Sequence, residues 1–404
     1  MRQCPHCEPI KANDRHFAER ITLSLGRIVL FLIWPVRPLI KLVRPTYMFL
    51  SAYITLFIVS LGSLTHVLVK RIPLGDSQVQ LRTKLFTLAS AKRRLLVTTF
   101  YFLGKYPTPL CLLQKNHQRF LFETIPSAGE LAISSFAYDN KMEFKKLLAR
   151  HHLPFVRGAS FLFFYPAFKY AQRLLLAKVT LVIKPLDGSL SKHTFVNINS
   201  KAEARKAIKS VLFISLFVLV EEYVEGFNFR ATMVGFNQVA VAKRLPPTIV
   251  GDGQSTIAQL LEAKNVNKLR GPTNSRNHAL HQVVVNDFLL GRLARQGYNL
   301  ATVLAKNEAC ELSGKINLAS GADIYDVTAT VYPHNRALFE RVATLLGEPI
   351  VGLDIIAEDL GVSYLRKPIY IIEANPKPFF EMHHFPLEGE SRDVAGALAD
   401  LYAS

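Results

Sequence analysis

The stretch Ile369–Asn375 reads IYIIEAN, and the earlier stretch Val351–Ala357 reads VGLDIIA. Both are short, apolar and rich in β-branched residues, which predicts two buried strands. Glu373 and Asn375 are two residues apart, so a strand places both side chains on one face. If the two strands form an antiparallel pair, Asp354 can approach them. Buried carboxylates cost free energy unless they are paired or bind a metal, so these three side chains predict an oxygen site suited to Mg²⁺.

From about residue 110 onward the sequence alternates between helical and strand patterns, which predicts an α/β (α+β) fold. The predicted strands are Val179–Lys184, Phe217–Glu222, Phe229–Val234, Val239–Arg244, Val351–Ala357 and Ile369–Asn375. The predicted helices are Met142–Arg150, Ala202–Leu212, Ala258–Ala263, Val283–Gln296, His334–Leu346 and a last helix from about Asp393. The sequence contains no internal repeat and no low-complexity tract.

Polar motifs lie between these elements in a fixed order. Along the chain they are Asp139-Asn-Lys141, Leu153–Gly158, Val182–Gly188, Leu219–Gly226, Ala240–Arg244, Val250–Thr256, Ile316–Gly321, Gly352–Asp354 and Ile371–Asn375. Lys184, for example, ends a strand and enters the Gly/Ser-rich turn Asp187–Lys192. Backbone N–H groups in such a turn can cradle phosphate oxygens while the lysine supplies charge. Taken alone, however, this turn is more typical of a surface hairpin with a solvated lysine.

In this order and at these spacings the motifs resemble those of ATP-grasp ligases, especially the ATP-grasp module of cyanophycin synthetases and bifunctional glutathione synthetases. The resemblance covers roughly residues 110–404. It implies an ATP-grasp fold, in which two α/β subdomains clasp ATP, and it implies ATP and Mg²⁺ (or Mn²⁺ in its place) as cofactors. The implied reaction joins a carboxylate to an amine through an acyl phosphate, with an amino acid or peptide as substrate. Family members are often homo-oligomers.

The resemblance also assigns roles to individual residues. Those implied to bind ATP are Lys141, Lys184, Gly188, Ser189, Glu221, Glu222 and Asn228. Those implied to hold Mg²⁺ are Asp354, Glu373 and Asn375. Those implied to act on the reacting groups are Arg230, Arg244 and Asn317. Asn228 takes the place of an acidic residue that holds the ribose in the family, and an amide binds a hydroxyl more weakly than a carboxylate does.

Three places depart from the family pattern. Gly188 is followed by serines where the phosphate loop usually has glycines, and the loop Asn317–Ala322 lacks a second glycine. Phe379 stands where glycine is expected, and Glu381 stands where arginine is expected. Because this last region helps to shape the acceptor site, it predicts either a different substrate or a module that binds ATP without ligating, with a regulatory or scaffolding role. The chain is also too short for the further domains of a complete cyanophycin synthetase.

The first hundred or so residues differ from the rest. Thr46–Val69 contains no Asp, Glu, Lys or Arg and is long enough to cross a membrane as a helix, which would attach the protein to the membrane on its cytoplasmic side. The alternative is a small α/β domain with buried apolar strands. Those strands would be Ile28–Trp34, Ile54–Leu61 and Leu95–Tyr101. Either way, residues 1–109 are predicted to form a hydrophobic N-terminal region and residues 110–404 the ATP-grasp domain.

Charge and cysteine content narrow the possible partners. The chain of 404 residues is 50% hydrophobic, with a formal net charge of +18, a pI of about 9.7 and a mean hydropathy of +0.18. A basic chain suits anionic partners such as nucleotides. No basic run is interleaved with aromatic residues, so nucleic acid is not predicted as a partner. Four cysteines are too few for a disulfide scaffold, and the pair Cys4 and Cys7 has no second pair with which to hold zinc.

Overall fold

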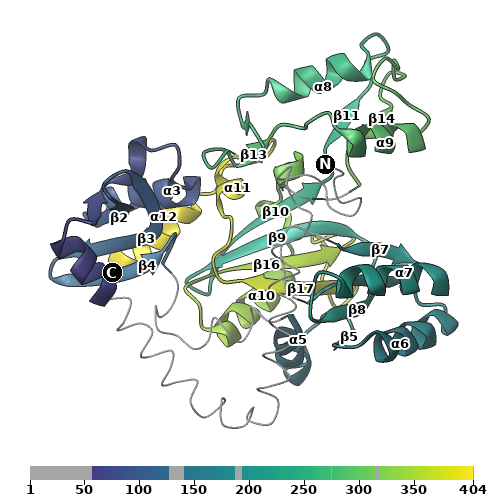
Figure 1. The fold of residues 1–404 in the computed structure, drawn as a ribbon, viewed down its shortest axis with the longest axis horizontal. Helices are drawn as coiled ribbons and strands as arrows, with labels where there is room; N and C mark the ends of the chain where they lie inside the picture. Colours follow the sequence, from purple (N-terminus) through teal and green to yellow (C-terminus); the bar gives the residue numbers. More distant parts are fainter. Residues whose placement is uncertain are drawn as a thin grey trace.

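The centre of the fold is a five-stranded antiparallel sheet (Figure 1). The computed structural model describes residues 57–126, 141–186, 193–273, 275–314, 316 and 318–403. In spatial order the central strands are β15 (Asp323–Asp326), β10 (Gln238–Leu245), β9 (Phe227–Val234), β16 (Ile350–Ala357) and β17 (Ile369–Asn375). Four of these five strands are predicted from the sequence, and β15 is not.

Side chains alternate along each strand, so the two faces of the central sheet carry different kinds of side chain. Phe229, Ala231 and Met233 point to one face and form the main core with α10 (Pro333–Leu346) and α5 (Lys141–Arg150). The residues between them therefore point to the other face. That second face carries polar side chains in its middle, and it is where the candidate site lies.

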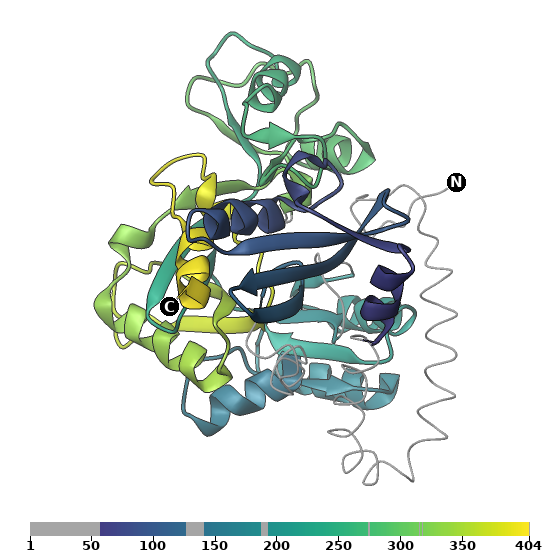
Figure 2. The same ribbon diagram turned by 90° about the vertical axis from the view of Figure 1, so that its left-hand side faces the viewer.

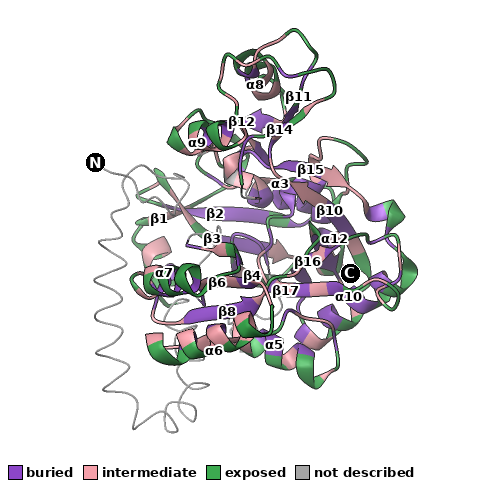
Figure 3. Ribbon diagram, turned by 90° about the vertical axis from the view of Figure 1, so that its right-hand side faces the viewer, coloured by how far each residue is buried: buried purple, intermediate pink, exposed green. Residues whose placement is uncertain are grey.

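A second sheet of four strands lies beside the central one (Figures 1 and 3). Its strands, in spatial order, are β5 (Gly158–Phe161), β8 (Val218–Glu222), β6 (Leu181–Pro185) and β7 (Phe195–Ile198). The helices α6 (Phe164–Leu176) and α7 (Lys201–Leu212) bury their apolar sides against it. Helix α6 is not predicted from the sequence, because Pro166 interrupts its pattern. In the structure that proline lies in the first turn, where a proline is tolerated.

The N-terminal part of the described chain forms a third sheet, in the order β1-β2-β3-β4. The strands are β1 (Leu68–Arg71), β2 (Leu96–Phe102), β3 (Tyr106–Lys115) and β4 (Gln118–Glu123), and the sheet is covered by α3 (Leu81–Ala91). The C-terminal helix α12 (Val394–Ala403) packs on α3, so the two ends of the described chain share one core (Figure 2). Residue 110, the predicted start of the ATP-grasp domain, lies inside β3.

The membrane helix predicted over Thr46–Val69 is wrong at its C-terminal end. Residues 57–64 are helical, but Leu68 and Val69 belong to β1 and pair with Phe102 and Tyr101 of β2. Among the described residues, no helix is both long enough and apolar enough to span a membrane. Residues 46–56 lie outside the described part.

Of the alternative buried strands, the one predicted at Leu95–Tyr101 is confirmed as β2. The strand predicted at Ile54–Leu61 is wrong, because residues 57–61 are helical. Ile28–Trp34, Cys4 and Cys7 lie outside the described residues. The other two cysteines, Cys111 and Cys310, are buried free thiols.

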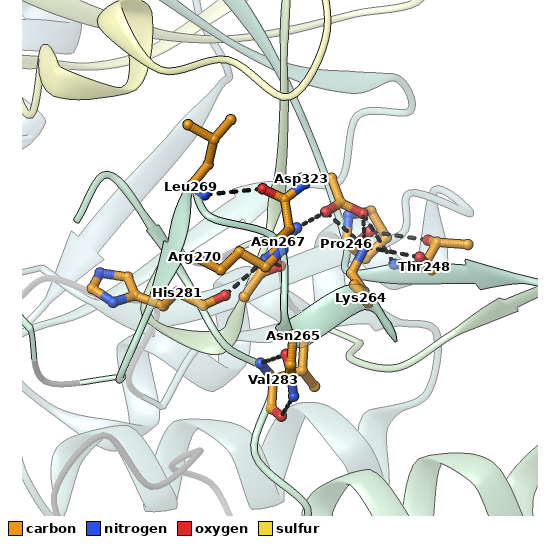
Figure 4. A network of polar contacts seen from close by, with 11 residues as sticks. Pro246, Thr248, Lys264, Asn265, Asn267, Leu269, Arg270, His281, Val283 and Asp323 are labelled. Carbon is orange, nitrogen blue, oxygen red and sulfur yellow. Dashed lines mark hydrogen bonds and ion pairs between the residues drawn. The ribbon is translucent and has the colours of Figure 1, made fainter. Parts of the chain in front are cut away.

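Residues 246–322 form a separate lobe inserted between β10 and β15. The lobe contains β11 (Thr248–Val250), α8 (Ile257–Asn265), β12 (Arg270–Gly271), β13 (Leu280–His281), α9 (Asp287–Arg295) and β14 (Ala309–Glu311), around a core of its own. Asp323 at the start of β15 ties this lobe to the central sheet (Figure 4). Both of its oxygens lie 2.8 Å from Lys264 Nζ, Arg270 donates to the same carboxylate, and the backbone N–H of Thr248 donates at 3.2 Å.

Candidate functional site

The centre of the candidate site is the Asp354 carboxylate on β16, opposite Arg230 on β9. Arg230 donates to both carboxylate oxygens, through Nε at 2.7 Å and Nη2 at 3.0 Å. Arg244, from β10, donates through Nη2 at 2.5 Å, and its Nε donates to Asn228 at 2.6 Å. Burial opposes the ionisation of Asp354, but the two guanidinium groups outweigh burial and hold its pKa well below the usual range.

A β-bulge decides where Glu373 points. In the pairing of β16 with β17, Ile371 lies opposite Ile355, but Glu373 lies opposite Asp354, so Ile372 is an extra residue. Regular alternation from the buried Ile371 would direct Glu373 into the main core. The bulge shifts the alternation by one residue, so Ala374 enters the core and Glu373 faces Asp354. Burial and the nearby Asp354 charge raise the pKa of Glu373.

The three oxygen-bearing side chains predicted to hold Mg²⁺ come together on this face. Glu373 is directly opposite Asp354 across the strand pair, and Asn375 Nδ2 lies 3.4 Å from Asp354 Oδ2. Two facing carboxylates raise the free energy of the ionised pair, and a bound divalent cation would relieve that repulsion. The donors therefore fit Mg²⁺, with the remaining ligands left to phosphate oxygens. Among the described residues no cluster of three His, Cys, Asp or Glu side chains could hold a metal, so the amide of Asn375 is needed to complete the set.

The predicted phosphate lysines approach the same place from α5 and from the second sheet. Lys141, at the start of α5, has its Nζ 3.7 Å from Glu373 Oε2 and donates to the carbonyl of Leu186 at 3.2 Å. Lys184 on β6 forms an ion pair of 2.6 Å with Glu221 on β8. Glu373 interacts electrostatically with both lysines. The site thus lies between the central sheet and the second sheet.

Glu221 is held by two lysines, and only one of them is predicted from the sequence. Lys145, one turn after Lys141 on α5, lies 2.8 Å from Glu221 Oε1 and donates to the carbonyl of Val156 at 2.6 Å. Burial opposes the ionisation of Glu221, but Lys184 and Lys145 outweigh it and lower the pKa of the carboxyl. The spacing of four residues from Lys141, beside the apolar Phe144, could have identified Lys145 as a buried lysine.

The structure does not bring every predicted residue into the cluster. Glu222 follows Glu221 on β8, so its side chain points to the other face of the second sheet, and it interacts electrostatically with Tyr170 of α6. Gly188, Ser189 and Asn317 lie outside the described residues. The predicted residues that do converge are Lys141, Lys184, Glu221, Asn228, Arg230, Arg244, Asp354, Glu373 and Asn375.

The departure from the family pattern around Phe379 lies against α3, the helix that covers the N-terminal sheet. Arg82 of α3 lies over the Phe379 ring, with its guanidinium carbon 4.3 Å from the ring centroid. Its Nε donates to Gln80 at 2.7 Å and its Nη1 donates to the carbonyl of Lys377 at 2.8 Å. Arg82 is far from this region in the sequence and belongs to no motif, so no sequence signal could have placed it here.

The three sheets and their helices form a mixed α/β fold that matches the fold of the ATP-grasp ligases. A crystal structure of a bifunctional glutathione synthetase from Pasteurella multocida superposes with a TM-score of 0.62, at 22% identity, over 80% of this chain and 44% of that one. At this identity the match shows the fold alone. No family model matches the chain.

Sequence relatives place the chain among these ligases. It is 33% identical over 289 residues to a cyanophycin synthetase of Trichormus variabilis, covering 71% of this chain and 31% of that protein. It is 28% identical over 296 residues to a glutathione biosynthesis bifunctional protein of Streptococcus mutans, covering 72% of this chain and 39% of that protein. The ATP-grasp resemblance predicted from the ordered motifs is therefore confirmed. The chain spans about a third of the length of these relatives.

Proposed function

We propose that this protein is an ATP- and Mg²⁺-dependent carboxylate–amine ligase that forms an amide or peptide bond through an acyl phosphate. The observation that carries the proposal is the Asp354–Glu373 pair, which faces two lysines and two arginines across a single buried site. Relatives that are ATP-grasp ligases support the reaction class.

The proposed roles follow from position. Lys141 on α5 and Lys184 on β6 would neutralise the phosphates of ATP, and Asn228, on the strand after β8, would hold the ribose. Asp354, Glu373 and Asn375 would hold Mg²⁺, which when bound withdraws charge from the transferred phosphoryl group. Arg230 and Arg244 lie beside this site and would stabilise the oxyanion that forms when the amine attacks the acyl phosphate. No protein nucleophile is required.

A second candidate is an ATP-binding module without ligase activity, and one observation favours it. Asp354 is already paired with two arginines, so a metal must compete with Arg230 and Arg244 for its oxygens. If these pairs persist when nucleotide is bound, the Mg²⁺ site is incomplete and the acyl phosphate does not form. The two candidates differ in whether ATP turnover depends on a carboxylate and an amine.

The test is phosphate release by the full chain with ATP and Mg²⁺, in the presence of pooled amino acids and short peptides. The full chain is needed because a start at residue 110 would cut through β3. We expect release that requires both a carboxylate and an amine, and a loss of at least about a hundredfold in Glu373→Gln. Glu358→Gln, at an exposed ion pair with Lys367, is the matched control. Nucleotide binding without any such release would favour the second candidate.

A further inference from the structure

Three buried polar atoms, one of Arg230 and two of residues near it, lack a hydrogen-bond partner among the described residues. They are Glu381 Oε2, His383 Nδ1 and Arg230 Nη1. The exposed fractions of these residues are 7%, 2% and 5%. Burying a polar atom without a partner costs free energy, so native proteins retain few such atoms. Three of them in neighbouring residues indicate a place where a polar ligand binds.

The short helix α11 (Glu381–His384) places this group on the polar face of the central sheet. His383 Nε2 lies 2.8 Å from the hydroxyl of Thr232, which is two residues after Arg230 on β9 and so points to the same face. Arg230 interacts electrostatically with Asp354, Glu373 and Glu381. It therefore interacts with both the proposed phosphoryl site and the Glu381 carboxyl.

Glu381 has no ion-pair partner in the part of the chain that the structure describes. Arg82 of α3 interacts electrostatically with Glu381, but its Nε and Nη1 donate to Gln80 and to the carbonyl of Lys377. Burial raises the pKa of Glu381, and the charges of Arg82 and Arg230 offset only part of that effect. A buried carboxyl that lacks a cation is complementary to a ligand that brings one.

We propose that Glu381 binds the ammonium group of the amine substrate and that, together with His383 and Arg230, it selects a cationic acceptor. This inference rests on the proposed ligase function and names one substrate class for it. His383 is held neutral, because burial and the Arg230 charge lower its pKa to about 3, so it adds a hydrogen-bonding group without adding a competing charge. The Phe379 ring, with Arg82 over it, lies two residues before Glu381 in the chain.

Binding of amines that carry no carboxylate tests the proposal directly. Glycinamide, L-lysinamide and L-argininamide would be titrated by calorimetry into the full chain with Mg²⁺ and a non-hydrolysable ATP analogue. We expect at least one amide to bind, with its Kd raised about tenfold or more in Glu381→Gln and the Kd of the nucleotide unchanged. Glu381→Asp keeps the charge and should retain part of the affinity. Glu358→Gln, which is exposed, should bind as the unaltered protein does.

The proposal is overturned if the unaltered protein and Glu381→Gln bind the amides equally, or if the unaltered protein binds none of them. Hydroxylamine separates this outcome from failure of the ligase function. It is mostly uncharged at neutral pH and traps an acyl phosphate as a hydroxamate without needing an ammonium site. Glu381→Gln should form hydroxamate at the normal rate while losing ligation to amino acids. If neither protein forms hydroxamate, the ligase function fails, and the amide titration still decides the role of Glu381.

Discussion

Two buried aspartates, Asp323 and Asp354, lie in the same central sheet, and each is held by two cations. Asp323 at the edge accepts hydrogen bonds from Lys264, Arg270 and a backbone N–H (Figure 4). Asp354 in the middle receives two arginines but faces a second carboxylate, Glu373, and its partner Arg230 has an unpaired Nη1.

This difference distinguishes a structural ion pair from a functional site. Charge and burial are alike in the two places, so neither property separates them. What separates them is whether the polar groups satisfy one another. The Asp323 network is complete and joins the inserted lobe to the sheet. The Asp354 group leaves both two facing carboxylates and an unpaired donor, which a nucleotide with its metal could satisfy.

The largest expected effect is on stability, at the complete network. Asp323→Asn would leave Lys264 and Arg270 buried without a carboxylate, and we expect the free energy of unfolding to fall by about 3–5 kcal/mol. Urea denaturation monitored by circular dichroism measures this change. Asp400→Asn breaks an exposed pair with Arg93 and should cost less than about 1 kcal/mol. Equal losses in the two variants would show that the Asp323 network is not a structural tie.

At the incomplete group we expect a large effect on activity and a smaller one on stability. Asp354→Asn removes a carboxylate proposed to hold Mg²⁺, so phosphate release should fall at least about a hundredfold. Glu373 interacts electrostatically with Arg230 and can compensate part of the lost charge. The loss of unfolding free energy should therefore be smaller than in Asp323→Asn. A larger loss of unfolding free energy than in Asp323→Asn, with phosphate release retained, would show that Asp354 is the structural residue of the two.

The pH dependence of stability tests the burial of His383 beside the same group. Its pKa is lowered to about 3 in the folded state, whereas an unfolded histidine titrates near 6.5. Below pH 6.5 only the unfolded chain gains this proton, so stability is lost as the pH falls from about 6.5 towards 3. The expected slope is about 1.4 kcal/mol per pH unit.

The measurement compares urea denaturation between pH 7 and pH 5. His383→Gln removes the titrating group and should reduce the slope by that amount. His117→Gln, at an exposed position, is the matched control. If His383→Gln leaves the slope unchanged, His383 is protonated in the folded protein, and its proposed neutral role beside Glu381 is wrong.

A third carboxylate between two cations, Glu221, gives the smallest expected effect. Lys145→Met removes one of its two lysines, which leaves Lys184 more tightly bound to Glu221 and less available to phosphate. We expect the Kd for ATP to rise about tenfold, measured by calorimetry. Lys146→Met, the next residue on α5 with a side chain that is 55% exposed, should leave the Kd unchanged. Equal affinities in the two variants would mean that Lys145 does not position Glu221 for the nucleotide.

Local patterns in the sequence predict a good part of this arrangement. The short apolar runs predict both strands, because strand type follows from patterns a few residues long, and an antiparallel pairing of the two would let Asp354 approach Glu373. The bulge at Ile372 is not predicted, since one extra residue leaves no compositional signal. The contacts of Arg230 and Arg244 with Asp354 are also not predicted, because they depend on the register between distant strands.

Contacts between distant parts of the chain are the least predictable. Arg82 meets the Phe379 region only because α3 and α12 pack together, and no short pattern encodes that packing. The membrane prediction fails at its end for a related reason. Apolar length alone cannot distinguish a spanning helix from a short helix followed by a strand that pairs with β2.

The packing of α12 on α3 also has a consequence for how the protein is made. The N-terminal sheet is complete in sequence by Glu123, but the helix that closes its core is synthesised only after the central and second sheets. At ordinary rates of synthesis the interval is about 15–60 s. During that time the apolar side of α3, including Phe86, is not covered by α12. A nascent chain of this protein therefore exposes an apolar surface that the folded molecule buries.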